Sequence, residues 1–326
     1  MGKKIIVIGC GAIGSRHLQA LCKIDIPVNI FAVDTSKQSL DNAKKLVGKI
    51  INHNIKSLEF SEEIPKNIDE IDLCIIATSS NVRLSILKKL ISSYSIKNLI
   101  LEKVLFQSVE ELDEAKSIIH KKKINCWVNH TRREDQCWKD VKKILSGYSN
   151  MKLYYGKYNW NMCSVAIHMI DLAVWLFDDK ITHIDNSNLD NEIHQSKRQG
   201  FIEMTGILSV EFKNGSTVKL ESIHGTSKEK VIFEISNDSV KLIVNEFEGK
   251  GILYRKDNNW IAEPYDFYRP LQSEKTQIIA KKILENKPCN LTKFNESVEI
   301  HRHMLVSFID HLNKNSNSKY NYCPIT

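Results

Sequence analysis

The sequence predicts an α/β protein in which a doubly wound parallel sheet precedes an α+β domain with one large, open, mainly antiparallel sheet. Two observations lead to this prediction. Over the first 130 residues, short continuous apolar strand patterns alternate with helical patterns, as in a parallel sheet covered on both faces. Beyond that point, strand patterns follow one another with few helices between them. We therefore predict two domains, at 1–130 and 131–326.

The elements of the first domain follow from this alternation. Its strands are predicted at Lys4–Gly9, Val28–Asp34, Asp72–Thr78, Asn98–Glu102 and Ile124–Asn129. Its helices are predicted at Ile13–Cys22, in the polar stretch that ends near Val47, at Val82–Ile91 and at Val109–His120.

The second domain begins with helices and continues with strands. Helices are predicted at Gln136–Ile144, Ser164–Phe177, Glu274–Glu285 and Glu296–Asn313. Strands are predicted at Met151–Trp160, Gly200–Lys213, Ser216–His224, Lys230–Ile235, Val240–Asn245 and Gly251–Arg255. Asn214-Gly215 predicts a tight hairpin turn in which both residues have positive φ.

Composition excludes several classes of protein. With 42% hydrophobic and 26% charged residues, the chain is neither disordered nor fibrous. The net charge of +7 is not gathered in a dense tract, so it suits an anionic small ligand and gives no support for nucleic-acid binding. Eight scattered cysteines without a Cys-x-x-Cys pair fit a reducing compartment, and no apolar stretch is long enough for a membrane helix. We expect a soluble, cytoplasmic protein.

Two kinds of catalytic site find no support in the sequence. His301 and His303 lie on different faces of a predicted helix, with no acid or cysteine at ligand spacing, so no metal site is predicted. No Gly-x-Ser-x-Gly motif indicates a serine hydrolase.

The strongest functional signal is the run Gly9-Cys10-Gly11-Ala12-Ile13-Gly14, which follows the first strand and opens the first helix. Gly9 permits the tight turn, Gly11 lets a pyrophosphate approach the backbone, and Gly14 lets helix and strand pack closely. The helix start at Ala12 and Ile13 would present free N–H groups to the phosphates. The alternative is a glycine turn that binds nothing.

Asp34 supports a dinucleotide site and bears on the choice of cofactor. It ends the second strand 20 residues after Gly14, where a carboxylate can bind the adenosine ribose 2′-hydroxyl. Because a carboxylate repels a 2′-phosphate, we predict NAD as the cofactor. Ser36 and Lys37 are close enough in sequence to offer a phosphate site, so NADP remains a possible cofactor.

Lys103 is a candidate for proton transfer. It follows the strand that ends at Glu102, and ligands of doubly wound sheets bind beyond the carboxyl ends of the strands. A lysine there can exchange a proton with a hydroxyl or carbonyl during hydride transfer. Taken alone, a lysine after a strand is more often a solvated charge.

A polar stripe on the helix Ser164–Phe177 offers further candidates. Ser164, His168 and Asp171 lie on one side of a helix that is otherwise apolar and therefore buried. Polar groups on a buried helix need partners or a cavity. His168 is thus either an active-site residue or a core histidine bonded to Asp171.

Several motifs, taken in order, resemble the Gfo/Idh/MocA oxidoreductases, the family of glucose–fructose oxidoreductase and inositol dehydrogenase. They are Gly9-x-Gly-x-x-Gly14-x-Arg-His17, Ala77-Thr78-Ser79-Ser80, Glu102-Lys103 and His168-x-x-Asp171. More loosely, the segment with Leu291, Ser297 and His301 is similar to the closing helices of members associated with surface-polysaccharide sugar pathways.

The resemblance implies a Rossmann domain, NAD(P), and oxidation or reduction of a sugar, polyol or nucleotide sugar. It implies that Thr78, Ser79 and Glu102 bind the cofactor, and that Lys103 and His168 are catalytic. Membership also implies a homodimer or homotetramer.

The chain departs from the family pattern in three motifs. Val104 replaces the proline of the usual Glu-Lys-Pro, Thr78-Ser79-Ser80-Asn81-Val82-Arg83 replaces Thr-Pro-Asn-x-x-His, and Ser164 replaces an aspartate four residues before His168. Val104 and Ser164 motivate an alternative function, a dinucleotide- or sugar-binding regulator without turnover. A reductase of a bilin or a dihydrodiol is a third possibility.

Substrate contacts are predicted from both domains. Asn129 and Arg132 follow the last strand of the first domain, where the family places substrate-binding residues, although a solvated linker would give the same pattern. Tyr158, from an aromatic-rich strand, is an alternative proton donor. Ser164 and Asp171 complete the predicted substrate set. Arg16 and His17 are either ligand contacts or surface side chains.

Overall fold

The computed structural model describes residues 2–66, 68–225 and 232–326, which form two compact units. The first unit contains Met1–Phe106, Glu110–Glu134 and Pro270–Asn295. The second contains Gln107–Val109, Asp135–Arg269 and Glu296–Thr326. The chain therefore returns to the first unit at 270–295, a segment that a simple division at residue 130 leaves out.

The first unit is built on a mostly parallel sheet. Its strand order is β17-β8-β7-β5-β1-β2-β3, and only β17 is antiparallel to its neighbour. The strands are β1 (Lys3–Ile8), β2 (Val28–Val33), β3 (Ile55–Ser61), β5 (Leu73–Ile76), β7 (Asn98–Leu101), β8 (Asn125–Val128) and β17 (Thr292–Lys293). A small parallel pair is formed by β4 (Glu70–Ile71) and β6 (Ser95–Ile96). The predicted doubly wound sheet is confirmed.

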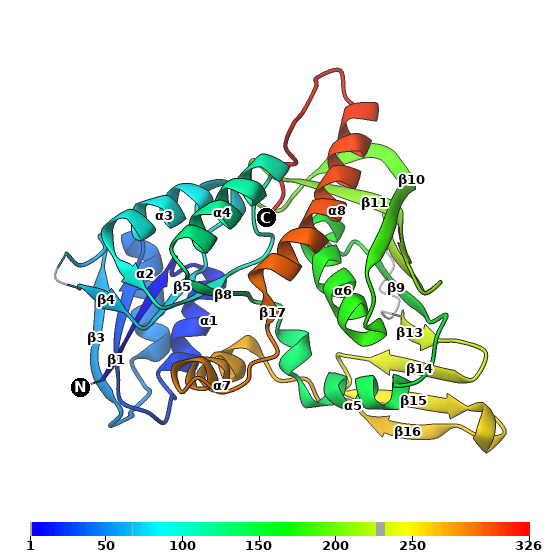
Figure 1. Cartoon of the computed structure of the whole chain (residues 1–326), viewed down its shortest axis with the longest axis horizontal. Helices are drawn as coiled ribbons and strands as arrows, with labels where there is room; N and C mark the ends of the chain where they lie inside the picture. Colours follow the sequence, from blue (N-terminus) through cyan, green and yellow to red (C-terminus); the bar gives the residue numbers. More distant parts are fainter. Residues whose placement is uncertain (1, 67, 226–231) are drawn as a thin grey trace. The chain divides into compact units, whose positions relative to one another are not determined.

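Helices cover both faces of this sheet. They are α1 (Ala12–Leu21), α2 (Lys37–Val47), α3 (Ser80–Ser93), α4 (Val109–Lys121) and α7 (Gln272–Leu284). Figure 1 shows α3 and α4 along one face, and α1 and α7 along the other, where these two helices pack together. Strands β5 and β7 are fully buried and β1 buries its last four residues, which explains their continuous apolar sequences.

The second unit contains an eight-stranded sheet in the order β10-β11-β12-β9-β13-β14-β15-β16. Its strands are β9 (Lys152–Tyr158), β10 (Ile181–Gln195), β11 (Ile202–Phe212), β12 (Thr217–Ile223), β13 (Ile232–Ser236), β14 (Val240–Asn245), β15 (Lys250–Arg255) and β16 (Glu263–Asp266). All neighbours are antiparallel except β12 and β9. The helices are α5 (Gln136–Leu145), α6 (Met162–Phe177) and α8 (Phe294–Lys314). The predicted open, mainly antiparallel sheet is confirmed.

The turn at Asn214-Gly215 differs from its prediction. Gly215 has a φ of +83°, whereas Asn214 is not among the residues with positive φ. The N–H of Gly215 donates to the carbonyl of Phe212, and the N–H of Phe212 donates to the carbonyl of Ser216. This pattern is a three-residue hairpin loop in which only the last position requires the left-handed region.

Six strands of the described residues have no counterpart among the predictions: β3, β10, β16 and the two-residue strands β4, β6 and β17. β3 and β10 mix polar and apolar residues without clean alternation, and register shifts interrupt the pairing of β10 with β11. β16 is short and lies at the sheet edge. In the predicted strand Lys230–Ile235, residues 230 and 231 lie outside the described residues.

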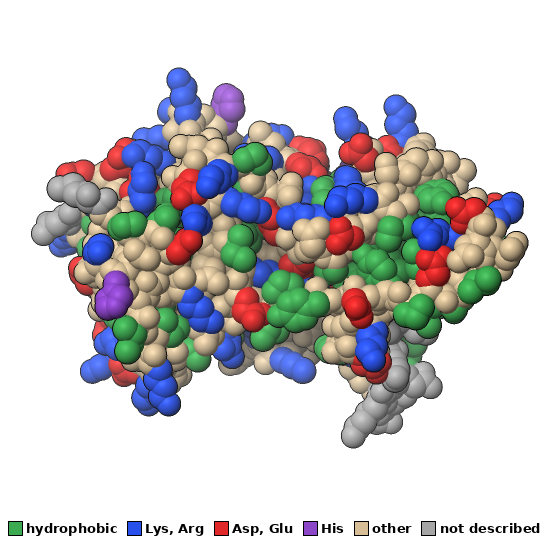
Figure 2. Space-filling view, turned by 90° about the horizontal axis from the view of Figure 1, so that it is seen from below, with side chains coloured by type: hydrophobic (Ala, Val, Ile, Leu, Met, Phe, Trp, Pro, Cys, Tyr) green, Lys and Arg blue, Asp and Glu red, His purple; other side chains and the backbone are tan. Residues whose placement is uncertain are grey.

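Two surface properties agree with the composition. On the face shown in Figure 2, Lys and Arg side chains are spread among Asp and Glu and do not form one basic tract. Among the described residues, no helix has both the length and the apolar character needed to cross a membrane.

Candidate cofactor and active site

The glycine run forms a tight turn between β1 and α1. Gly9 has a φ of +88°, and a Cβ atom there would lie 2.9 Å from the backbone carbon of Ala77. A Cβ atom on Gly14 would lie 1.7 Å from the carbonyl oxygen of Gly9. These two positions therefore accept only glycine, since any other residue would push α1 away from the strand.

The space over Gly11 is different, because a Cβ atom there would meet nothing within 4 Å. Gly11 is the residue before α1, and its side chain position, like those of Ala12 and Ile13, is exposed. The start of α1 therefore offers open backbone to a ligand, as a pyrophosphate site requires.

Asp34 is anchored to this turn by both of its carboxylate oxygens. Oδ2 accepts the N–H of Cys10 at 2.6 Å, and Oδ1 accepts the N–H of Ser36 at 2.8 Å. Burial, with a smaller contribution from Asp34, raises the pKa of the Cys10 thiol to about 12. Cys10 is therefore a neutral packing residue, and the charge of this region belongs to Asp34.

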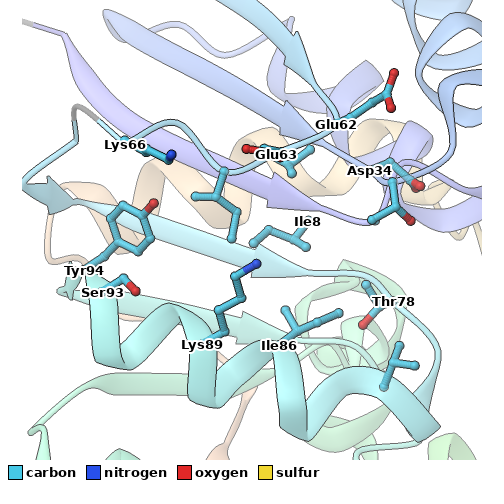
Figure 3. Close-up of a pocket in the computed structure, with 15 residues that line it drawn as sticks. Ile8, Asp34, Glu62, Glu63, Lys66, Thr78, Ile86, Lys89, Ser93 and Tyr94 are labelled. Carbon is cyan, nitrogen blue, oxygen red and sulfur yellow. The ribbon is translucent and has the colours of Figure 1, made fainter.

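A cavity of about 820 Å³ opens beside the turn (Figure 3). Gly9, Asp34 and Thr78 of the predicted cofactor residues line it. The Oγ1 atom of Thr78 is buried and has no hydrogen-bond partner among the described residues. A buried hydroxyl without a partner is costly, so a ligand in this cavity would satisfy it.

The rest of the cavity wall was not predicted from the sequence. Val82 and Ile86 of α3 and Ile64 of the loop after β3 supply apolar surface, and Lys66, Lys89 and Tyr94 are among its other lining residues. Figure 3 shows Asp34 and Thr78 at one end and Tyr94 at the other. The helical spacing of Val82 and Ile86 could have indicated that these two residues share one face of α3. Ile64 could not have been recognised, because it follows strand β3, which the sequence did not predict.

Ser79 and Arg83 organise the start of α3. The hydroxyl of Ser79 donates to Oδ1 of Asn81 at 2.8 Å. The guanidinium of Arg83, 1% exposed, donates to the carbonyls of Thr78, Val104 and Leu105. Burial lowers the pKa of Arg83 to about 10, and the charge of Glu102 opposes this shift. Arg83 is still a cation at neutral pH, and it connects the Thr78 turn to the loop that carries Lys103.

Glu102 is buried beneath that loop. Its Oε1 atom lies 2.9 Å from Nε2 of His17 and also accepts a hydrogen bond from the amide of Asn129. Burial raises the pKa of this carboxyl, but the hydrogen bond and charge of His17 outweigh it, so that the pKa is lowered overall. Glu102 is therefore an anion next to Lys103.

The burial of His17 and of the segment after β8 excludes two of the alternatives left open by the sequence. His17 is fully buried, so it is not a surface side chain. Asn129 and Arg132 are 4% and 7% exposed, so a solvated linker is wrong as well. His130 lies between these two residues in the chain. Burial, and to a smaller extent the charge of Arg133, lowers the pKa of His130 well below its usual value, which keeps this imidazole neutral.

The remaining candidates lie in the second unit. His168 and Ser164 are half-buried on α6, whereas Asp171 on the same helix is fully buried. The hydroxyl of Ser164 donates to the carbonyl of Asn161 at 3.2 Å. Tyr158, half-buried, ends β9. The exposure pattern of α6 agrees with a polar stripe on an otherwise buried helix.

Comparison with known proteins gives a family match for the first part of the chain. Residues 3–130 match the model of the Gfo/Idh/MocA oxidoreductase family, described as an NAD-binding Rossmann fold. No curated protein sequence matches the chain significantly.

Solved structures with similar folds cover nearly the whole chain. UDP-N-acetylglucosamine 3-dehydrogenase from Acidithiobacillus ferrooxidans is 12% identical over 94% of this chain and 97% of that chain, with a TM-score of 0.70. Biliverdin reductase from Synechocystis sp. PCC 6803, solved with biliverdin and NADP+, is 13% identical over 93% and 97%, with a TM-score of 0.71.

A third similar structure is a super-repressor mutant of Gal80p from Saccharomyces cerevisiae. It is 12% identical over 98% of this chain and 100% of that chain, with a TM-score of 0.71. At these identities the likeness establishes the fold of both units, and it does not distinguish between the three proteins as functional models.

Proposed function

We propose that the chain is an NAD(P)-dependent oxidoreductase that transfers a hydride between nicotinamide and a sugar, sugar derivative or nucleotide sugar. The observation that carries the proposal is the buried Thr78 hydroxyl, which has no hydrogen-bond partner among the described residues and belongs to a residue that lines the cavity with Gly9 and Asp34. The family match of residues 3–130 agrees with it.

The residues of the turn fit a dinucleotide. Gly11, Ala12 and Ile13 would hold the pyrophosphate at the open start of α1, while Gly9 and Gly14 keep the turn close to β1. Asp34 would bind the adenosine ribose, and Thr78 and Ser79 would hold the cofactor from the α3 side. The bound nicotinamide would supply or accept the hydride.

The anchoring of Asp34 favours NAD over NADP. Two backbone N–H groups hold its carboxylate, so the side chain cannot turn away to make room for a 2′-phosphate. We expect NADH to bind more tightly than NADPH, with a lower dissociation constant.

Lys103 would move the proton in this scheme. Its Nζ atom takes the proton from the substrate hydroxyl during oxidation and returns it during reduction, and the anion of Glu102 stabilises the ammonium form. His168 would assist Lys103, and Asn129, Arg132, Tyr158, Ser164 and Asp171 would bind the substrate. This assignment rests on the sequence motifs.

The sugar class is supported by the similar fold of a UDP-N-acetylglucosamine dehydrogenase. A role in surface-polysaccharide synthesis, a cytoplasmic location and a homodimeric or homotetrameric state complete the proposal. Size-exclusion chromatography with light scattering tests the last of these.

A second candidate is a dinucleotide-binding regulator without turnover. Ser164 in place of a carboxylate favours it, and so does the similar fold of Gal80p. Reduction of a bilin is the third candidate, favoured by the fold of biliverdin reductase.

Binding and turnover separate these candidates. Calorimetry with NADH and NADPH tests the cofactor site, and a panel of nucleotide sugars, inositols and bilins tests the reaction. We expect cofactor binding together with turnover of a sugar. Cofactor binding without turnover of any panel member would favour the regulator, and failure to bind either nucleotide would contradict the proposal.

Lys103→Met then tests the proton-transfer role. We expect kcat to fall by about 100-fold or more while the dissociation constant of NADH stays the same, because only the proton donor is removed. Lys23→Met, which removes an exposed lysine, is the matched control. Unchanged kcat in the Lys103 variant would exclude Lys103 as the acid–base group.

A further inference from the structure

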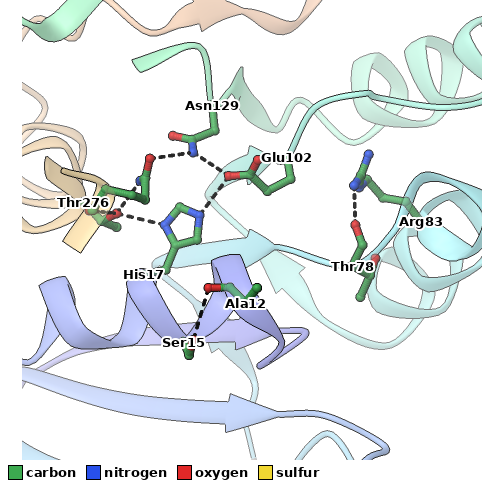
Figure 4. A network of polar contacts seen from close by, with 9 residues as sticks. Ala12, Ser15, His17, Thr78, Arg83, Glu102, Asn129 and Thr276 are labelled. Atoms are coloured by element: carbon green, nitrogen blue, oxygen red, sulfur yellow. Dashed lines mark hydrogen bonds and ion pairs between the residues drawn. The ribbon is translucent and has the colours of Figure 1, made fainter. Parts of the chain in front are cut away.

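A closed ring of hydrogen bonds lies behind Glu102 (Figure 4). His17 Nε2 lies 2.9 Å from Glu102 Oε1, and His17 Nδ1 lies 2.9 Å from the hydroxyl of Thr276. That hydroxyl accepts a hydrogen bond from Gln272 Nε2 at 2.8 Å. The amide nitrogen of Asn129 donates both to Gln272 Oε1, at 3.3 Å, and to Glu102 Oε1, which closes the ring.

The order of donors around the ring shows which nitrogen of His17 carries the proton that faces Glu102. An ionised Glu102 can only accept, so Nε2 of His17 must carry a proton. The hydroxyl of Thr276 accepts from Gln272 and has a second lone pair and one proton. It can donate to Nδ1 of a neutral His17, or accept from Nδ1–H of an imidazolium and donate to the carbonyl of Gln272, 3.5 Å away. In both forms the proton on Nε2 faces Glu102.

Because the ring is buried, a mismatched contact within it would cost free energy. His17 is fully buried, and Thr276, Asn129 and Glu102 are 1%, 4% and 7% exposed. Water cannot replace a lost partner at these positions, so a mismatched contact costs more than it would at the surface. The ring therefore strongly prefers one orientation of its side chains.

The ring is next to the proposed proton-transfer group. Lys103 follows Glu102 in the chain, and its charge contributes to the lowered pKa of Glu102. His17 and Arg83 are the other charged or titratable groups that act on Glu102. Around Lys103 itself, the electrostatic neighbours include His130, which also interacts with Arg132 and Arg133.

We infer that Thr276 and Gln272 of α7 are positioning residues for Lys103: they orient the side chains of His17 and Asn129 so that both donate to Glu102, which keeps Glu102 ionised beside the lysine. This inference rests on the proposed function for its effect on the reaction. The sequence motifs place neither residue in the site, because α7 lies about 170 positions beyond Glu102 in the chain.

Thr276→Val tests the ring with almost no change in side-chain shape, and Thr276→Ser restores the hydroxyl. In the valine variant Nδ1 of His17 loses its partner, so the imidazole is held less firmly against Glu102 and this carboxyl is ionised less completely. Lys103 then loses its proton at lower pH. We expect kcat to fall about tenfold with unchanged NADH affinity, and the limb of the kcat–pH profile that reports Lys103 to move to lower pH.

The serine variant is expected to restore kcat and the profile to within about twofold of the parent protein. If the valine variant does not fold, Gln272→Met at the half-buried first turn of α7 breaks the same ring at two contacts. A normal kcat and pH profile in the folded valine or methionine variant would overturn the inference.

A spectroscopic measurement tests the ring without any substrate. In protein labelled with ¹⁵N-histidine, long-range ¹H–¹⁵N spectra distinguish the two neutral tautomers, and His17→Gln identifies the signals of His17. We expect Nε2 of His17 to carry a proton in the parent protein and in Thr276→Ser, and a mixture of protonation patterns in Thr276→Val. An Nδ1–H pattern in the parent protein would overturn the inference. Absence of turnover in a protein with the expected tautomer would instead contradict the proposed function alone.

Discussion

The glycine turn and the Glu102 ring contrast two ways of building a functional site. The turn is formed by neighbours in the chain, from Gly9 to Gly14, and is completed by Asp34. The ring joins side chains as far apart in sequence as His17 and Thr276. The turn fixes the course of the backbone, whereas the ring fixes the charge of one carboxylate.

The two regions also differ in what they leave open. At the turn, the backbone at Gly11 is uncovered and the hydroxyl of Thr78 has no partner among the described residues. In the ring, hydrogen bonds link every side chain to two others. An open set of polar groups suits ligand binding, whereas a closed set supports the groups around it.

The largest effect is expected at the turn, from Gly14→Ala. The new Cβ atom would lie 1.7 Å from the carbonyl oxygen of Gly9, so α1 must move away from β1. We expect the free energy of unfolding, measured in urea, to fall by more than about 4 kcal/mol. Cofactor affinity should be lost with it.

Gly11→Ala is the matched variant that sharpens the comparison. Nothing lies within 4 Å of its new Cβ atom, and φ there is −64°, so stability should change by less than about 1 kcal/mol. NADH affinity should nevertheless fall, because the methyl group occupies the space of the pyrophosphate. Equal losses of stability in the two variants would contradict this division between a packing glycine and a binding glycine.

An intermediate effect on stability is expected from Arg83, which connects the Thr78 turn to the loop after Glu102. Arg83→Met leaves the carbonyls of Val104 and Leu105 without this donor and removes a cation near Glu102. We expect a loss of about 3–5 kcal/mol in the free energy of unfolding. Arg83→Lys keeps the charge but cannot reach all the carbonyls, so its loss should be smaller. A methionine variant as stable as the parent would show that the connection is unimportant.

The smallest effect concerns pH and His130. Its pKa is lowered in the folded protein, so between pH 7.5 and 5.5 the unfolded chain binds a proton that the folded chain does not. The free energy of unfolding should therefore fall on acidification, with a slope from this group of up to about 1.4 kcal/mol per pH unit. His130→Gln should lack this component, as urea titrations at several pH values would measure.

The range from pH 7.5 to 5.5 distinguishes the contribution of His130 to stability from that of Glu102. The pKa of Glu102 is lowered from a usual value of 4.5, so the stability that it contributes is lost only at more acidic pH. If the parent and His130→Gln lose stability equally between pH 7.5 and 5.5, His130 does not titrate as its burial indicates.

The amino-acid sequence determined the features that depend on neighbours in the chain. The apolar runs specified the parallel strands, and the spacing of Gly9, Gly11 and Gly14 specified the turn, because steric limits on a backbone act over a few residues. The period of α6 likewise specified its polar stripe. Strands with mixed patterns, such as β3, could not be recognised in this way.

Only the tertiary structure decided which distant polar groups meet. It buried His17 against Glu102 and Thr276, used Arg83 to connect two loops, and returned residues 270–295 to the first unit. Hydrogen bonds act over about 3 Å, and no local pattern records which residue of α7 comes within that distance of α1. The charge state of Glu102 is therefore a property of the folded chain.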